Sequence, residues 1–232
     1  MKWDPRKFDS EWPFDVTGTG VALDPESSAL IVVDMQCDQM AIESDSPLGI
    51  GHPQIVEYWN RRLDETVIPN IRRLIDLFRN QDRKIVYTRN GYVTSTGDEM
   101  TKRLKKKVPV GSPISRRNSP GYQIAERLSP REVDLVVDKL TSGGFTGSFL
   151  DHALRNMGIR SVVITGILTD ACVFGTARAA AELGYGSLVC EDACATFTQR
   201  AHDDALLMHA RIFGRVDTTE EVLSELAAKV LQ

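Results

Sequence analysis

Short apolar runs alternate with amphipathic segments along most of this chain. Residues 29–34 read ALIVVD, a nearly continuous apolar run that ends in an acid. Such a run is typical of a central strand that is buried on both faces. Comparable but shorter runs lie at residues 85–88, 133–138, 162–166, 188–189 and 215–217. The pattern therefore predicts about six strands, with the fifth ending near Glu191 and Asp192.

The segments between these runs have helical spacing. Within residues 55–81, an apolar stripe is formed by Ile71, Leu74, Ile75 and Phe78, and Pro69 marks a new helix start. Further helices are predicted at residues 148–157, 173–183, 200–213 and 219–231, the last capped by Thr218 or Thr219. Strands that alternate with helices indicate an α/β fold, with a mainly parallel sheet, helices on both faces and right-handed crossovers.

Two stretches fall outside this alternation. Residues 1–28 contain scattered aromatic residues among prolines and glycines, without a period, so we expect an arm that wraps over the domain or packs on a neighbouring subunit. Residues 90–122 form a long connection, and a connection of that length inside a compact domain is usually functional. It carries a basic run at 102–107 that we interpret as a solvated helix face rather than a site for an anionic partner.

Length and composition exclude several classes of protein. The chain has 232 residues and a net charge of −4, which fits one large domain and gives no basic field for nucleic acid. No apolar run approaches the roughly 18 residues that a membrane span needs. The first residues lack the pattern of a secretory signal, and the four cysteines include no CxxC pair. We therefore expect a cytoplasmic protein with free thiols.

Three reactive side chains follow three of the predicted strands: Asp34, Lys139 and Cys172. Because parallel strands bring their carboxyl ends to one edge of a sheet, these groups should meet there. Cys172 follows a tight turn and falls in the first turn of a helix capped by Thr169 or Asp170, where the helix dipole should lower its pKa below roughly 8.5. The alternative is a cysteine that only packs under the sheet.

Together the three groups supply the parts of a nucleophilic site. Asp34 would take the thiol proton, and Lys139 would stabilise the thiolate and hold Asp34 ionised. Backbone N–H groups after the turn would bind an oxyanion. None of the four histidines directly follows a strand, so we do not expect a histidine base.

Four residues are candidates for substrate contacts. Arg89 ends the second strand and would bind a carboxylate or ureido oxygen, or else form a salt bridge with an acid in a loop. Gln36 and Phe145 would line the pocket, with core packing an equal alternative for Phe145. His209, one turn before the end of its helix, would line the pocket from above.

Three motifs carry a family resemblance: ALIVVDMQ with Asp34, VVDKLTSGGFTGSFLD with Lys139, and VVITGILTDACVFGTARAAAELGY with Cys172. On these motifs the chain resembles the isochorismatase-like cysteine hydrolase superfamily over roughly residues 29–230. The resemblance implies a three-layer Rossmann-like hydrolase domain at 29–232, and an Asp34–Lys139–Cys172 triad. It also implies a cis Ile167–Leu168 peptide, an oxyanion hole from the N–H groups of Leu168 and Cys172, and a homodimer or homotetramer.

Departures from the family pattern narrow the expected reaction. A retained Cys172 favours C–N hydrolysis over the vinyl-ether cleavage of isochorismatases. The Asp-x-His that begins the nicotinamidase metal site is missing, since Asp38 is followed by Gln39 and Met40, so we expect no metal and no cofactor. What remains resembles the N-carbamoylsarcosine amidase, ureidoacrylate and biuret or triuret hydrolase group, which releases ammonia from small amide or ureido compounds. A vinyl-ether hydrolase acting through Asp34 and a non-catalytic thiol sensor remain alternatives.

Overall fold

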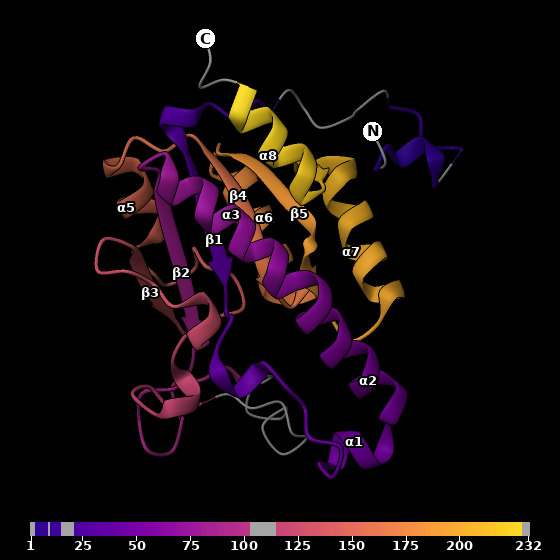
Figure 1. Ribbon diagram of the computed structural model, residues 1–232, viewed down its shortest axis with the longest axis vertical. Coiled ribbons are helices and arrows are strands. Elements are labelled where there is room, and N and C mark those ends of the chain that lie inside the picture. Colours follow the sequence, from indigo (N-terminus) through magenta and orange to yellow (C-terminus); the bar gives the residue numbers. More distant parts are fainter. Residues whose placement is uncertain (1–2, 9, 15–20, 103–114, 229–232) are drawn as a thin grey trace.

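The protein is organised around one six-stranded parallel sheet (Figure 1). The computed structural model describes residues 3–8, 10–14, 21–102 and 115–228, so most of the basic run at 102–107 and the end of the last helix lie outside it. The strand order is β3-β2-β1-β4-β5-β6. The strands are β1 Ser28–Val33, β2 Lys84–Asn90, β3 Leu135–Lys139, β4 Ser161–Ile167, β5 Gly186–Ala195 and β6 Arg215–Asp217.

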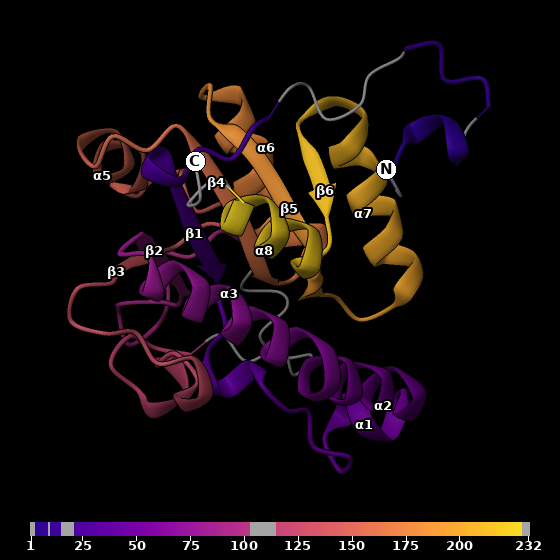
Figure 2. The same ribbon diagram turned by 45° about the horizontal axis from the view of Figure 1, so that its top comes forward.

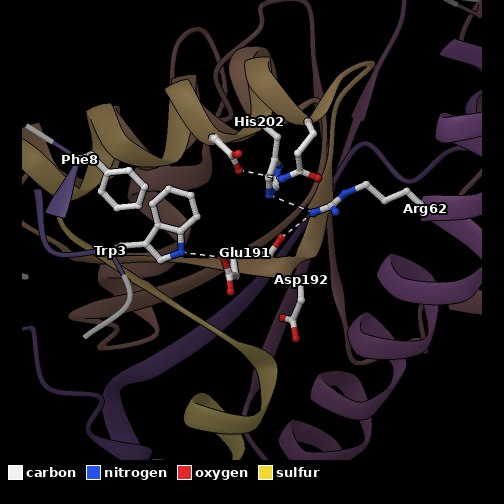
Figure 3. Close-up of a pocket in the computed structure, with 8 residues that line it drawn as sticks. Trp3, Phe8, Arg62, Glu191, Asp192 and His202 are labelled. Carbon is white, nitrogen blue, oxygen red and sulfur yellow. Dashed lines mark hydrogen bonds between the residues drawn. The ribbon is translucent and has the colours of Figure 1, made fainter.

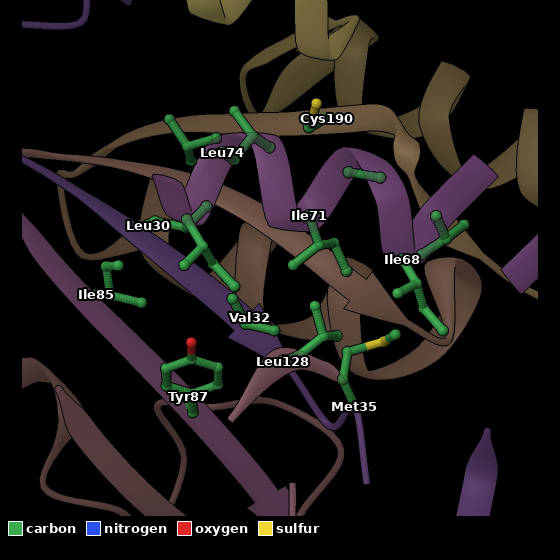
Figure 4. Packing of buried hydrophobic residues seen from close by; sticks show 14 of the residues in the cluster. Leu30, Val32, Met35, Ile68, Ile71, Leu74, Ile85, Tyr87, Leu128 and Cys190 are labelled. Carbon is green, nitrogen blue, oxygen red and sulfur yellow. The ribbon is translucent and has the colours of Figure 1, made fainter. Parts of the chain in front are cut away.

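Helices cover both faces of this sheet, as Figures 1 and 2 show. Helices α3 (Ile68–Asn80) and α8 (Thr219–Ala228) pack on one face, and α5 (Leu150–Asn156), α6 (Phe174–Glu182) and α7 (Gln199–Ile212) pack on the other. Central strand β1 is buried along its whole length. Its Leu30 and Val32 join the core under α3 and α8 (Figure 4), and its Ile31 joins the opposite core. The structure confirms the predicted three-layer α/β fold.

A new α-helix begins at Ile68 with Pro69 in its first turn, as predicted, and the residues directly before it are helical as well. Helices α1 (Pro47–Gly51) and α2 (Pro53–Arg62) lead into a wide π-helical turn, Leu63–Val67, and then into α3. A proline inside a helix lacks an N–H donor and crowds the preceding turn. The wider turn accommodates both effects, which is how a helix of this kind often continues past such a residue.

Strand β5 extends beyond the predicted end at Glu191 and Asp192, to Ala195. Buried Glu191 accepts a 2.6 Å hydrogen bond from the Trp3 indole, and the Asp192 carboxylate accepts one of 2.7 Å from the Thr219 N–H. Because tertiary partners satisfy these acids, they do not end the strand. Conversely, β3 begins at Leu135, and Val133 before it is 87% exposed.

The N-terminal arm packs on the domain through its first aromatic residue. The Trp3 side chain is 3% exposed and belongs to the core beneath α5, α6 and α7. It stacks on Phe8 with a ring separation of 5.3 Å. This contact agrees with an arm that wraps over the domain, whereas the boundary at residue 28 stays a prediction. Within the described parts of the chain, no helix has the length and apolarity that a membrane crossing requires.

Two glycines with positive φ provide a test of how tightly β4 packs on β1. Gly166 has φ +108°, and a Cβ atom there would lie 2.1 Å from the Val33 carbonyl oxygen. Gly184 has φ +89° but open space around it. We predict that Gly184→Ala lowers the free energy of unfolding by about 1–2 kcal/mol, from backbone strain alone. Gly166→Ala should cost about 4 kcal/mol or more, because the clash is with backbone. Urea unfolding of both variants measures the difference, and equal losses would contradict the packing.

Candidate functional site

The site begins at Asp34, the residue that directly follows β1. Its backbone has φ 52°, in the left-handed region, where Asp is tolerated better than most residues. The residue is 2% exposed. One carboxylate oxygen, Oδ1, accepts a 2.7 Å hydrogen bond from the Thr88 hydroxyl on neighbouring β2. The other oxygen, Oδ2, faces Lys139.

Lys139 is the last residue of β3, and its side chain has no exposed surface. The ammonium donates to Asp34 Oδ2 at 2.6 Å and to the carbonyl oxygens of Thr141 and Ser142 at 3.0 and 3.1 Å. These three bonds use all three ammonium hydrogens. Burial lowers the pKa of Lys139, but Asp34 and Cys172 raise it by more, so the pKa stays above its usual value. Lys139 is therefore a buried cation.

Cys172 lies in a π-helical turn, Thr169–Val173, that opens α6; we call this segment the Cys172 turn. The predicted caps are not formed, because the Thr169 hydroxyl pairs with His202 at 2.8 Å and Asp170 accepts a bond from the Thr196 hydroxyl at 2.6 Å. The Cys172 thiol interacts with both Asp34 and Lys139. The three residues at the strand tips thus come together as the sequence predicted.

The protonation of the thiol differs from the prediction. Burial raises the pKa of Cys172 to about 12; Lys139 opposes this shift and Asp34 reinforces it. The expected lowering by the helix terminus is wrong, because removal of the thiolate from water outweighs it. At neutral pH the resting sulfur carries its proton.

A pair of glycines brings the loop after β3 against the start of α6. A Cβ atom on Gly143 would lie 3.2 Å from the carbonyl oxygen of Gly175, so the two backbones are in close contact. Beside them, the Thr176 hydroxyl donates to the Cys172 carbonyl at 2.6 Å and accepts from the Gly144 N–H at 2.9 Å. The glycine-rich segment therefore fixes the Cys172 turn relative to the Lys139 loop.

The Ile167–Leu168 peptide, at the end of β4, is cis. The Leu168 carbonyl accepts hydrogen bonds from the N–H groups of Ala171 and Val173, each at 3.0 Å. These bonds fold the chain back immediately before Cys172. That the N–H groups of Leu168 and Cys172 bind an oxyanion stays a prediction.

Gln36 and Arg89 are both engaged by the protein. The buried Gln36 amide donates to the Asn90 and Tyr122 carbonyls and accepts from the Asn90 N–H at 2.8 Å. It ties the loop after β1 to the end of β2, and a contact of Gln36 with substrate stays a prediction. Because Thr88 points at Asp34 and strand side chains alternate, Arg89 points to the opposite face. There it pairs with Asp138 at 2.8 Å and lies over a tyrosine ring. The salt bridge of the second alternative is therefore formed, but with an acid of β3 rather than with a loop acid.

Phe145 packs in the core, and His209 lies near the start of β5 rather than at the strand tips. Phe145 packs 5.8 Å from the Tyr185 ring within the core, which is its core-packing alternative. The prediction that His209 lines the pocket is wrong. Helix α7 starts beyond the carboxyl end of β5 and runs back along it, which places His209 beside the Ser187 carbonyl, at the other end of the strand. Burial lowers its pKa to about 4, so it is neutral.

The histidine that does approach the site is His202. It is 2% exposed, and one ring nitrogen contacts the Thr169 hydroxyl at 2.8 Å. The other contacts the Arg62 guanidinium at 2.9 Å (Figure 3). Little in the sequence indicates this role, because His202 lies one turn into α7 rather than at a strand end. Its apolar-face spacing with Leu206 and His209 is the signal for burial.

Asp38 lies close enough to Asp34 for the two carboxyl groups to interact. Burial raises the pKa of Asp38 to about 6, although a hydrogen bond from Ser115 opposes the shift. Among the residues that the structure describes, no group of three or more His, Cys, Asp or Glu side chains is arranged to hold a metal ion.

Comparisons with known proteins agree on one family. The Isochorismatase domain model matches residues 28–221. Ureidoacrylate amidohydrolase RutB of Serratia proteamaculans is 30% identical over 225 residues, covering 91% of this chain and 88% of the relative.

Solved structures share the fold. An Isochorismatase family protein from Burkholderia thailandensis superposes with a TM-score of 0.71 at 28% identity, covering 91% of this chain and 100% of that one. A cysteine hydrolase from Pseudomonas syringae has a TM-score of 0.76 at 24% identity and coverages of 93% and 99%. With the sheet, the three strand-tip residues and the matched span of residues 28–221 in agreement, the chain belongs to the isochorismatase domain family.

Proposed function

We propose that this protein is a cysteine-dependent amidohydrolase that cleaves a C–N bond of a small amide or ureido compound, such as a biuret-, triuret- or N-carbamoyl-type substrate, and releases ammonia. The observation that carries the proposal is the buried Lys139–Asp34 pair, with its 2.6 Å contact, beside the Cys172 thiol. The similarity to a ureidoacrylate amidohydrolase at 30% identity supports the same class of reaction.

The raised pKa of Cys172 assigns the first task to Asp34. Because the thiol is protonated at rest, it needs a base as it attacks, and the Asp34 carboxylate is adjacent and held by hydrogen bonds. The sulfur bonds to the substrate carbonyl carbon while its proton moves to Asp34. The carbonyl oxygen becomes an oxyanion. We propose that the backbone N–H groups of Leu168 and Cys172 bind it.

The remaining steps return the enzyme to its starting state. Asp34 gives its proton to the leaving nitrogen, the C–N bond breaks, and ammonia departs from a thioester on Cys172. Asp34 then takes a proton from water as the water oxygen attacks the thioester carbonyl. The C–S bond breaks, the sulfur regains a proton from Asp34, and the free acid leaves.

Lys139 serves this cycle by stabilising the ionised form of Asp34. A buried carboxylate without a counter-charge tends to stay protonated, and a protonated Asp34 cannot act as a base. The same ammonium also favours the thiolate, since it lowers the pKa of Cys172 against the effect of burial. From the family resemblance we further propose a cytoplasmic homodimer or homotetramer.

Substitution of Cys172 tests the nucleophile. We predict that Cys172→Ser and Cys172→Ala abolish ammonia release from a panel of amides, ureides and N-carbamoyl amino acids, because no other group replaces the sulfur. Cys37→Ser is the matched control: Cys37 is exposed and should be dispensable. Ammonia is measured by a coupled glutamate dehydrogenase assay. Full turnover by Cys172→Ala would reject a thioester route and favour cleavage through Asp34 alone, as in a vinyl-ether hydrolase.

Substitution of Lys139 tests the electrostatic role of its ammonium group in the proposed mechanism. We predict that Lys139→Met lowers kcat/KM by about 100-fold or more, since the base loses its stabilising charge. While Asp34 is ionised, the same change raises the pKa of Cys172 further, because Lys139 lowers it in the wild type. Alkylation of Cys172 by iodoacetamide, followed by mass spectrometry from pH 7 to 10.5, should therefore slow toward the alkaline end of that range, where Asp34 is ionised. Lys84→Met, on exposed Lys84 at the start of β2, is the control and should match the wild type. Faster alkylation in Lys139→Met at that alkaline end would contradict the assignment.

A further inference from the structure

A chain of hydrogen bonds connects the end of β5 to the Cys172 turn. It starts at Arg62, the last residue of α2, whose guanidinium donates to the backbone carbonyls of Glu191 and Cys194, each at 3.1 Å. The same guanidinium contacts His202 Nε2 at 2.9 Å, and His202 Nδ1 contacts the Thr169 hydroxyl at 2.8 Å. Figure 3 shows Arg62 reaching across from α2 to His202 on α7.

Donor and acceptor chemistry sets the direction of this chain. Arginine nitrogens only donate, so His202 Nε2 must accept the bond from Arg62. In a neutral imidazole the other nitrogen then carries the proton, so Nδ1 donates to the Thr169 oxygen. Arg62 thus selects the tautomer that binds Thr169, as an outer partner commonly does for a histidine at a functional site.

The position of Thr169 explains how this chain of hydrogen bonds acts on the site. Thr169 is 2% exposed and lies between the cis Ile167–Leu168 peptide and Cys172. It opens the turn that presents the thiol. Since the turn begins without a side-chain cap, the His202 bond is a contact from another element that fixes its first residue.

We propose that Arg62 and His202 form a positioning pair that holds the Cys172 turn in register with Asp34 and Lys139. The inference rests on the proposed function, because its effect on turnover is through Cys172. Neither side chain is assigned a role in proton transfer or substrate binding. A displacement of about 1 Å in a nucleophile costs about 100-fold in rate, so the loss of this contact should lower kcat.

The test uses pairs of variants in the full-length protein. Thr169→Val and His202→Phe remove the contact with little change in volume, and each should lower kcat by about 10–100-fold while KM changes by less than about threefold. The double variant should be no worse than the worse single variant, because both remove one interaction. Thr169→Ser keeps the hydroxyl and His202→Asn keeps a donor near Nδ1, so both should recover most of the activity. His152→Phe, on exposed His152 of α5, is the control.

A second measurement separates this proposal from the proposed function. The rate of Cys172 alkylation by iodoacetamide should change in Thr169→Val and His202→Phe and return toward the wild-type rate in Thr169→Ser. These alkylation rates can be measured whether or not a substrate is found. A wild type that hydrolyses nothing would reject the proposed function, while the alkylation rates still decide the positioning pair.

The pair is overturned if both variants keep kcat and alkylation rates within about twofold of the wild type, or if their losses add in the double variant. Circular dichroism melts show whether each variant is folded. If His202→Phe loses its melting transition, Thr169→Val, which keeps the shape of the side chain, and Thr169→Ser, which keeps the hydroxyl, decide the outcome.

Discussion

The buried ion pair between Lys139 and Asp34 is the interaction on which the site depends. Removing a charge from water costs several kcal/mol for each ion, unless its partners in the protein compensate. Here every ammonium hydrogen has an acceptor, and both carboxylate oxygens are bonded. The pair joins β1 to β3 across β2, and the Thr88 hydroxyl of β2 lies between them. The sheet order therefore builds the pair, and the pair holds the carboxyl edge of the sheet together.

Burial at this edge of the sheet also decides the protonation of the Cys172 sulfur. The start of a helix favours a thiolate, but the Cys172 turn is enclosed enough that burial raises the pKa of Cys172 to about 12. A protonated thiol is resistant to adventitious oxidation and alkylation, since the thiolate is the reactive form. Such a sulfur becomes a nucleophile only when a base is adjacent, and Asp34 supplies one. The resting thiol is therefore unreactive. The Asp34 carboxylate makes it a nucleophile when it meets a substrate carbonyl.

Several neighbours fix the geometry of the Cys172 turn. Gly166 lets β4 approach the Val33 carbonyl more closely than any side chain allows, and Gly143 lets the Lys139 loop contact α6. Hydrogen bonds to Thr169, Asp170 and the Cys172 carbonyl hold the turn from α7, from the residue after β5 and from α6 itself. Positioning of this kind, from rigid strands and a packed helix, suits a site in which three side chains must stay within bonding distance.

The sequence by itself determined the layers, the parallel sheet and the three strand-tip residues. Local periodicity decides which segments become strands, and parallel pairing brings their carboxyl ends to one edge, so Asp34, Lys139 and Cys172 could be placed together without coordinates. Local patterns could not show where β5 ends, because the buried Glu191 carboxylate accepts a hydrogen bond from Trp3, which lies 188 positions away. They could not place Arg89, whose neighbour Thr88 takes the face toward Asp34, nor His209, which the direction of α7 carries to the far edge. The pKa of Cys172 and the contact of His202 were likewise decided by tertiary structure, because burial and long-range hydrogen bonds depend on residues that no local stretch contains.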